Sequence, residues 1–247
     1  MVEAASRGAD LVVLPEAMQR DFGPPDVDLS TDAETLDGPF VAALAEVAAR
    51  EGVTVVAGMF ESVPQSKKVH NSLVIVSAEG LVGRYRKLHL YDALGWRESD
   101  RIVAGTPAED AAVVVPVAEH RIGVMTCYDV RFPEVARMLV DAGATVLVVP
   151  AAFVQGPGKA EQWRVLLQAR AIENTAYVVA ADQPGPEYTG LSMIVDPRGH
   201  VMTALDESAP GIAVGEVSAD VTAAVRRALP LLEARRFEVR ARPDRTS

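Results

Sequence analysis

Short apolar runs that alternate with helix-like segments constrain this 247-residue chain more than any other feature. Residues 9–16 and 53–61 form runs of this kind, and so do residues 144–150 and 176–182. Their length and composition are typical of strands that are buried on both faces. Between the first two runs, residues 39–52 carry apolar side chains at helical spacing. This alternation predicts an α/β fold in which helices cover the faces of the sheets.

Other segments predict hairpins. The expected hairpins lie at residues 71–87, at 111–127 and around 196–199. Further helices are expected at 133–143 and 159–175, and a last strand at 211–217. Because hairpins and crossovers occur in one chain without a linker-like segment, we expect one domain over residues 1–247 with mixed sheets.

Composition excludes several classes of protein. The net charge is −10 and Lys and Arg are scattered apart from the C-terminal stretch, so nothing resembles the basic footprint of a nucleic-acid-binding protein. No apolar run reaches the roughly 18 residues of a membrane-spanning helix, and no secretory segment opens the chain. The single cysteine, Cys127, allows no internal disulfide, which fits a reducing compartment. We therefore expect a soluble, cytoplasmic protein, and we interpret the basic stretch at 226–245 as a solvated or partner-facing tail.

Three residues with useful chemistry follow directly on predicted strands. Glu16, Lys87 and Cys127 each stand just beyond a predicted strand. Ligands collect at the carboxyl ends of strands in α/β folds, so the repetition carries more weight than any one residue. Taken singly, each has an ordinary interpretation: a core cysteine, a helix-start carboxylate and a surface lysine.

Together, the three side chains suit acyl transfer. A thiolate is a nucleophile, Glu16 can act as a general base for the thiol, and Lys87 can stabilise an oxyanion. Backbone N–H groups of the helix that follows Cys127 are expected to lower the pKa of the thiol. The chemistry that these residues predict is hydrolysis through a thioester. No metal or cofactor is expected, because the four histidines show no ligand spacing.

The surroundings of the three residues resemble the nitrilase superfamily of carbon–nitrogen hydrolases. The segments "LVVLPE", "YRKLHLYD" and "CYDVRFPE" are similar to its Glu, Lys and Cys motifs, and the resemblance continues through residues 162–199. It implies a four-layer αββα sandwich, a homodimer or higher homo-oligomer, and no cofactor. It also implies that Glu98 holds the lysine and orients the substrate amide. The Tyr128 backbone N–H would donate to the oxyanion.

The residues after Cys127 resemble the branch that contains ω-amidase and deaminated-glutathione amidase. The implied reaction is release of ammonia or an amine from a small carboxylic-acid amide. Arg131 is a candidate for the substrate carboxylate, although pairing with Asp129 or Glu134 is the preferred interpretation. Phe153 is a further substrate-binding candidate. The alternatives are a nitrilase, an N-carbamoyl-amino-acid hydrolase, and an impaired member that acts by binding.

The chain departs from the family pattern in three places. It begins inside a helix, so the N-terminal strand of the family is missing, which suggests a truncated chain or a wrongly assigned start. Without that strand, backbone groups of its neighbour are left unpaired unless a partner covers them. Gln162 and Asp182 stand where relatives often carry other residues. Both are expected to alter the fit of the substrate.

Overall fold

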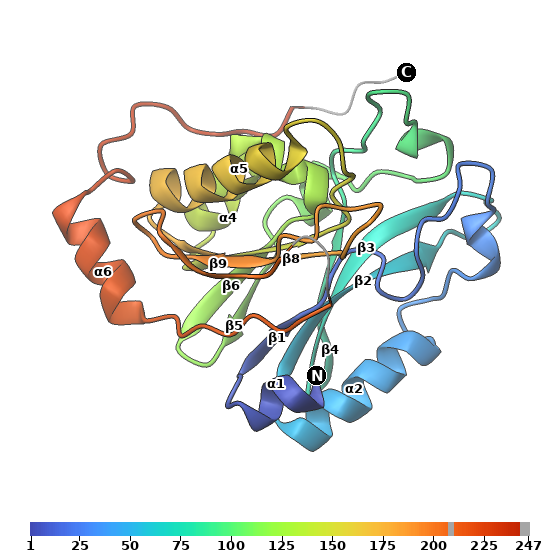
Figure 1. The fold of residues 1–247 in the computed structure, drawn as a ribbon, viewed down its shortest axis with the longest axis horizontal. Helices are drawn as coiled ribbons and strands as arrows, with labels where there is room; N and C mark the ends of the chain where they lie inside the picture. Colours follow the sequence, from blue (N-terminus) through green and yellow to red (C-terminus); the bar gives the residue numbers. More distant parts are fainter. Residues whose placement is uncertain (207–209, 243–247) are drawn as a thin grey trace.

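The chain forms four layers in the computed structural model, which describes residues 1–206 and 210–242 (Figure 1). Helix α2 (Pro39–Glu51) covers a four-stranded sheet, and helices α4 (Pro133–Asp141) and α5 (Lys159–Asn174) cover a six-stranded sheet. The two sheets pack against each other between these helical layers. The structure confirms the predicted αββα sandwich.

Both sheets are mixed, as predicted. The four-stranded sheet has the order β1 (Leu11–Val13), β2 (Thr54–Ser62), β3 (Val69–Ser77) and β4 (Gly80–Arg86). The six-stranded sheet has the order β10 (Val201–Ala204), β9 (Met193–Val195), β8 (Tyr177–Asp182), β7 (Val146–Ala151), β6 (His120–Val124) and β5 (Val114–Val117). Strands β6, β7 and β8 run parallel to one another, and β1 runs parallel to β2. The other pairs are antiparallel.

Alternation along each strand builds the layers. In β2, Val55 and Ala57 face α2, whereas Val56 faces the other sheet. In β7, Val148 packs between the sheets, and Leu147 packs against the helical layer of α4 and α5. Successive side chains of a strand point to opposite faces, so a strand enclosed on both sides must be apolar throughout. This is why the short continuous runs predicted strands correctly.

The remaining helices are short. They are α1 (Val2–Ser6), α3 (Pro107–Asp110) and α6 (Ala219–Ala228), with 3₁₀ turns at Leu29–Thr31 (η1), Glu98–Asp100 (η2) and Cys127–Arg131 (η3). Helix α6 lies where the basic tail was expected to begin, and it starts at Ser218, whose hydroxyl accepts from the Val221 backbone N–H. Among the described residues, none of the helices combines the length and the apolarity needed to cross a membrane.

One predicted strand is absent from the sheets. Residues 211–217 belong to neither of them, so that prediction is wrong. Strand β1 pairs with β2 alone and forms an edge of its sheet. An apolar run becomes a strand only where a neighbouring backbone completes its hydrogen bonds, and the free edge of β1 lies across a cavity from 211–217.

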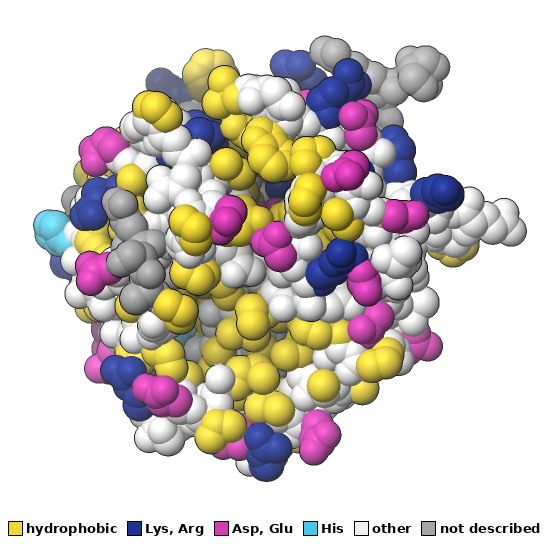
Figure 2. Space-filling model, turned by 45° about the vertical axis from the view of Figure 1, so that its right-hand side comes forward, with side chains coloured by type: hydrophobic (Ala, Val, Ile, Leu, Met, Phe, Trp, Pro, Cys, Tyr) yellow, Lys and Arg dark blue, Asp and Glu magenta, His cyan; other side chains and the backbone are white. Residues whose placement is uncertain are grey.

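That cavity has a volume of about 1050 Å³. Its walls come from β1, from residues 210–217 and from parts of β8 and β9. On the face drawn in Figure 2, hydrophobic side chains gather around a hollow in the lower half of the molecule. The lining residues of the cavity do not include Lys87, Glu98 or Cys127.

Candidate active site

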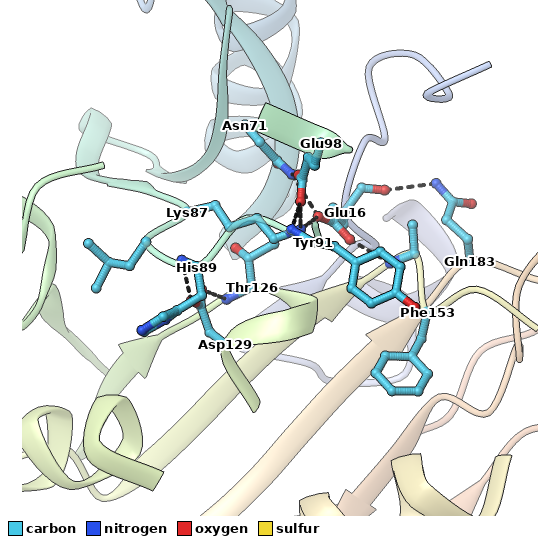
Figure 3. A network of polar contacts seen from close by, with 12 residues as sticks. Glu16, Asn71, Lys87, His89, Tyr91, Glu98, Thr126, Asp129, Phe153 and Gln183 are labelled. Atoms are coloured by element: carbon cyan, nitrogen blue, oxygen red, sulfur yellow. Dashed lines mark hydrogen bonds and ion pairs between the residues drawn. The ribbon is translucent and has the colours of Figure 1, made fainter. Parts of the chain in front are cut away.

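Four residues singled out in the sequence come from four different elements. Glu16 follows β1, Lys87 follows β4, Glu98 opens η2, and Cys127 opens η3 after β6. The charged groups of Glu16, Lys87 and Glu98 point toward one another (Figure 3). The structure therefore places residues from both sheets at one buried point, as expected for strand ends that share an edge.

Lys87 is the centre of an ion cluster. Its Nζ lies 2.9 Å from Glu16 Oε1, and it lies 3.0 Å and 2.9 Å from the two carboxylate oxygens of Glu98. Glu16 is 0% exposed, Lys87 2% and Glu98 9%. Burial alone would lower the pKa of Lys87, but the two carboxylates reverse this effect and raise it well above its usual value. The lysine therefore remains a cation.

Asn71 joins the two carboxylates, a role that the sequence analysis did not predict. Its Nδ2 donates to Glu16 Oε1 at 2.7 Å and to Glu98 Oε1 at 3.1 Å. Asn71 lies in β3 and is 1% exposed. A buried amide requires hydrogen-bond partners, and an asparagine inside a predicted strand was the available signal. Asn71 fixes the spacing of two like charges.

The second oxygen of Glu16 faces the other sheet. Glu16 Oε2 accepts from the Ala152 backbone N–H at 2.7 Å, and the Glu16 backbone carbonyl accepts from Gln183 Nε2 at 2.9 Å. Gly58 allows this loop to lie close to β2. A Cβ at residue 58 would lie 2.5 Å from the Ala17 backbone nitrogen and 2.7 Å from Glu16 Cα. A side chain at residue 58 would therefore displace Glu16.

Cys127 occupies a strained turn between β6 and η3. Its φ of 47° lies in the left-handed region, which non-glycine residues seldom adopt. The turn is held by Asp129, whose Oδ2 accepts from the Thr126 backbone N–H at 3.0 Å. Cys127 is 7% exposed, more than Glu16 or Lys87. A strained strand-to-helix turn of this kind presents a side chain above the end of a sheet.

The pKa of the thiol differs from the expectation. Burial raises the pKa of Cys127 well above its usual value, and the negative charge of Glu16 raises it further. The charge of Lys87 and the Ala152 backbone N–H oppose this effect without cancelling it. The predicted lowering by the following helix is wrong, because η3 is a short turn beside a cluster that holds two carboxylates and one cation. The resting thiol is protonated.

Asp129 connects the two sheets next to the thiol. It is 0% exposed and accepts from the Tyr85 hydroxyl of β4. Its Oδ1 lies 3.0 Å from the His89 backbone nitrogen and 2.8 Å from His89 Nδ1. Burial raises the pKa of Tyr85 well above its usual value, and the charge of Asp129 adds to this effect. Asp129 therefore ties the cysteine turn to the chain around Lys87.

Aromatic rings lie beside the catalytic groups. The ring centroids of Tyr128 and Tyr91 are 5.0 Å apart, and the Tyr91 ring points toward Phe153 in Figure 3.

Arg131 forms no ion pair with Asp129 or Glu134, so the preferred interpretation of this residue is wrong. Instead, it donates to Gln162 Oε1 at 2.9 Å, and its Cζ lies 5.2 Å from the Phe153 ring centroid.

Asp182 holds the backbone of Phe153 in place through a hydrogen bond. Its carboxylate accepts from the backbone N–H groups of Phe153 at 2.8 Å and of Gly190 at 3.0 Å, and from the Thr189 hydroxyl. Burial raises the pKa of Asp182 to about 7, although these three donors oppose the shift. Asp182 and Gln162, the two departures noted in the sequence, thus both lie next to the aromatic side of the site.

This arrangement can perform covalent catalysis. It offers a nucleophile, a buried carboxylate beside it and a fixed cation, which together serve attack, proton transfer and charge stabilisation. Over residues 1–206 and 210–242, no three His, Cys, Asp or Glu side chains form a group that could hold a metal ion.

The family model for carbon–nitrogen hydrolases matches residues 1–227, and the chain belongs to this family. It is a hydrolase that acts on carbon–nitrogen bonds other than peptide bonds. The chain is 41% identical over 240 residues to the deaminated glutathione amidase of Escherichia coli O157:H7, covering 96% of this chain and 88% of that protein. It is 36% identical over 258 residues to the enzyme of that name from Synechocystis, covering 95% and 89%.

Solved structures agree with the fold. The crystal structure of Saccharomyces cerevisiae Nit3, a member of branch 10 of the nitrilase superfamily, superposes with a TM-score of 0.83 at 27% identity. That match covers 96% of this chain and 88% of the yeast chain. The Caenorhabditis elegans NitFhit protein gives a TM-score of 0.82 at 31% identity, covering 96% of this chain and 59% of the worm chain.

Proposed function

We propose that the chain is an amidase that hydrolyses a small carboxylic-acid amide through a thioester on Cys127. The observation that carries this proposal is the position of the Cys127 turn next to a buried cluster in which Lys87 bridges Glu16 and Glu98. The names of the curated relatives, at 36% to 41% identity, favour an amide substrate.

The first half of the reaction forms the thioester. The Cys127 sulfur attacks the amide carbon while Glu16 accepts the thiol proton, which is needed because the resting thiol is protonated. The carbonyl oxygen becomes an oxyanion, and Lys87 and the Tyr128 backbone N–H stabilise it. Glu16 then gives its proton to the departing nitrogen, the carbon–nitrogen bond breaks, and ammonia or an amine leaves.

The second half returns the enzyme to its resting form. Glu16 takes a proton from a water molecule, whose oxygen attacks the thioester carbon. The carbon–sulfur bond then breaks, the acid product forms, and Glu16 returns the proton to the thiolate. Glu98 keeps Lys87 charged and in place through two contacts of 3.0 Å and 2.9 Å. Glu98 also accepts the Tyr91 backbone N–H at 2.7 Å, so it couples the lysine to the aromatic side of the site.

The experiment is ammonia release from a panel of substrates, by the purified protein and by Cys127→Ser. The panel contains ω-amides of oxo-dicarboxylic acids, deaminated glutathione, an aliphatic amide, an N-carbamoyl amino acid and a nitrile. Turnover of an amide that is lost in the variant supports the proposal, as does an acyl adduct on Cys127 in a mass spectrum. Turnover of the nitrile or the carbamoyl compound alone supports the corresponding alternative. Silence across the panel supports a member that acts by binding.

The expected homo-oligomer and cytoplasmic location remain predictions. Light scattering of the purified chain measures the first.

A further inference from the structure

A second buried lysine lies on the aromatic side of the site. Lys159 is the first residue of α5 and is 9% exposed. Its Nζ lies 3.1 Å from the Tyr91 hydroxyl oxygen, 5.0 Å from the Tyr91 ring centroid and 5.2 Å from the Phe153 ring centroid. No carboxylate oxygen of the described residues lies within ion-pair distance of it.

The two buried lysines therefore differ in charge balance. Lys87 contacts two carboxylates, whereas Lys159 has a hydroxyl oxygen and two ring faces. Cation–π contacts offset part of the cost of burying an ammonium, but an opposite charge compensates it better. Lysine is rarely buried to this degree without a counter-ion. An uncompensated cation beside catalytic groups favours an anionic ligand.

Both partners of Lys159 are tied to the catalytic groups. The Tyr91 backbone N–H donates to Glu98, and the Tyr91 ring packs on Tyr128, which follows the nucleophile. Phe153 follows Ala152, whose backbone N–H donates to Glu16. The ammonium of Lys159 thus contacts two residues that are each one step from the catalytic groups.

A second cation lies on the Phe153 ring. Arg131 Cζ is 5.2 Å from the ring centroid, and the guanidinium donates to the neutral side chain of Gln162. Phe153 therefore contacts two cationic groups, and neither has a carboxylate partner. Two cations therefore lie beside one ring, in a chain whose net charge is −10.

We propose that Lys159 binds a carboxylate of the substrate, with Arg131 as an outer second cation. This inference rests on the amidase function proposed above and specifies it further. The preferred substrates carry a carboxylate at the end remote from the amide that is cleaved. A charge-assisted hydrogen bond from Lys159 to that carboxylate selects these amides over neutral ones.

The test compares two amides of the same length. Succinamate ends in a carboxylate, and butanamide has a methyl group in its place. In Lys159→Met, the ratio of kcat/KM for succinamate to that for butanamide is expected to fall about 10- to 100-fold, mainly through KM. Lys159→Arg keeps the positive charge, so it should keep part of the preference for succinamate over butanamide. Arg164→Met removes an exposed cation from the same helix and leaves the ratio as it is.

A binding measurement separates this inference from the proposed function. Succinate is titrated calorimetrically into the wild-type protein and into both Met variants. If no amide of the panel is hydrolysed but succinate binds and Lys159→Met abolishes binding, the carboxylate site stands and the amidase proposal fails. If the amides are hydrolysed and Lys159→Met lowers both kcat/KM values equally, Lys159 has only a structural role and the inference is overturned. Succinate binding that is equal in all three proteins also overturns it.

Discussion

The two sheets contribute different kinds of atoms to the active site. The four-stranded sheet and its loops supply Glu16, Asn71, Lys87 and Glu98, whose charged and polar groups bind one another. The six-stranded sheet and its loops supply a neutral thiol on a strained backbone, together with backbone N–H groups and aromatic rings. In the first half the charges compensate one another, whereas the second half supplies the neutral nucleophile.

This difference implies that the two halves fail in different ways. A change in the charged half leaves buried ions without partners, so it lowers the free energy of unfolding as well as activity. A change of the thiol itself alters the reaction with little effect on folding, because the resting thiol is neutral. Measurements of stability alongside turnover test this division.

The largest expected effect on turnover comes from Cys127→Ser. The hydroxyl is similar in size to the thiol but is a much weaker nucleophile, so amide turnover should fall by at least about 10³-fold. The free energy of unfolding in urea should change by less than about 1 kcal/mol. Turnover within tenfold of the wild type would contradict the assignment of the nucleophile.

Lys87→Met should abolish turnover and also destabilise the fold. Without the cation, two buried carboxylates face each other, and removal of one partner from a buried ion cluster costs about 3–5 kcal/mol. Urea unfolding measures this loss. Lys68→Met is the control, because its exposed Nζ contacts only the Ser99 backbone carbonyl at 2.8 Å. Equal stability of the two variants would refute the division between the halves.

Asn71→Leu should give an intermediate result. It removes both hydrogen bonds to the glutamates, so we expect a loss of about 1–3 kcal/mol in stability and about tenfold in kcat. Ser72→Ala is a matched control on the same strand, because it also removes a buried hydrogen bond to a carboxylate, that of Glu61 at 2.7 Å. The control should lose stability and keep its kcat. A loss of kcat in both variants would show that β3 acts only through the fold.

Among these variants, Asp182→Asn should have the smallest effect on turnover. Its effect is best measured as the pH dependence of the free energy of unfolding. The folded pKa of Asp182, about 7, is raised, so the folded state holds a proton that the unfolded state loses near pH 4. The stability that this proton provides is complete below about pH 4 and is lost as the pH rises through about 7. Urea unfolding between pH 5 and 8 should show the wild type losing about 1 kcal/mol per unit relative to the variant, up to about pH 7. A difference that is independent of pH would argue against the raised pKa.

The sequence predicted the residues that stand at strand ends better than the residues that connect them. Glu16, Lys87 and Cys127 follow predicted strands, and the patterns of these strands are visible in the chain. Asn71 and Lys159 act through contacts with residues distant in sequence, 27 and 55 positions away for Asn71 and 68 for Lys159. Local patterns carry no information about such contacts. The αββα layers followed from the resemblance, and the mixed sheets followed from the alternation of hairpins and crossovers.

The errors have related causes. Residues 211–217 have the composition of a strand, but a strand also needs a neighbouring edge, and the edge of β1 lies across the cavity. Helix α6 was missed although Ser218 marks its start, because the basic residues that follow favoured a solvated tail. The pKa of Cys127 was mispredicted because the sequence does not show how deeply the thiol and Glu16 are buried together.

Gly58 has a consequence for how this protein tolerates variation. It carries no chemistry, and replacement by alanine changes hydrophobicity and size by a single methyl group. Yet that methyl group would occupy the space of the backbone at Glu16 and Ala17. A mutational scan scored by activity should therefore mark position 58 as strongly as a catalytic position, although no reacting atom belongs to it.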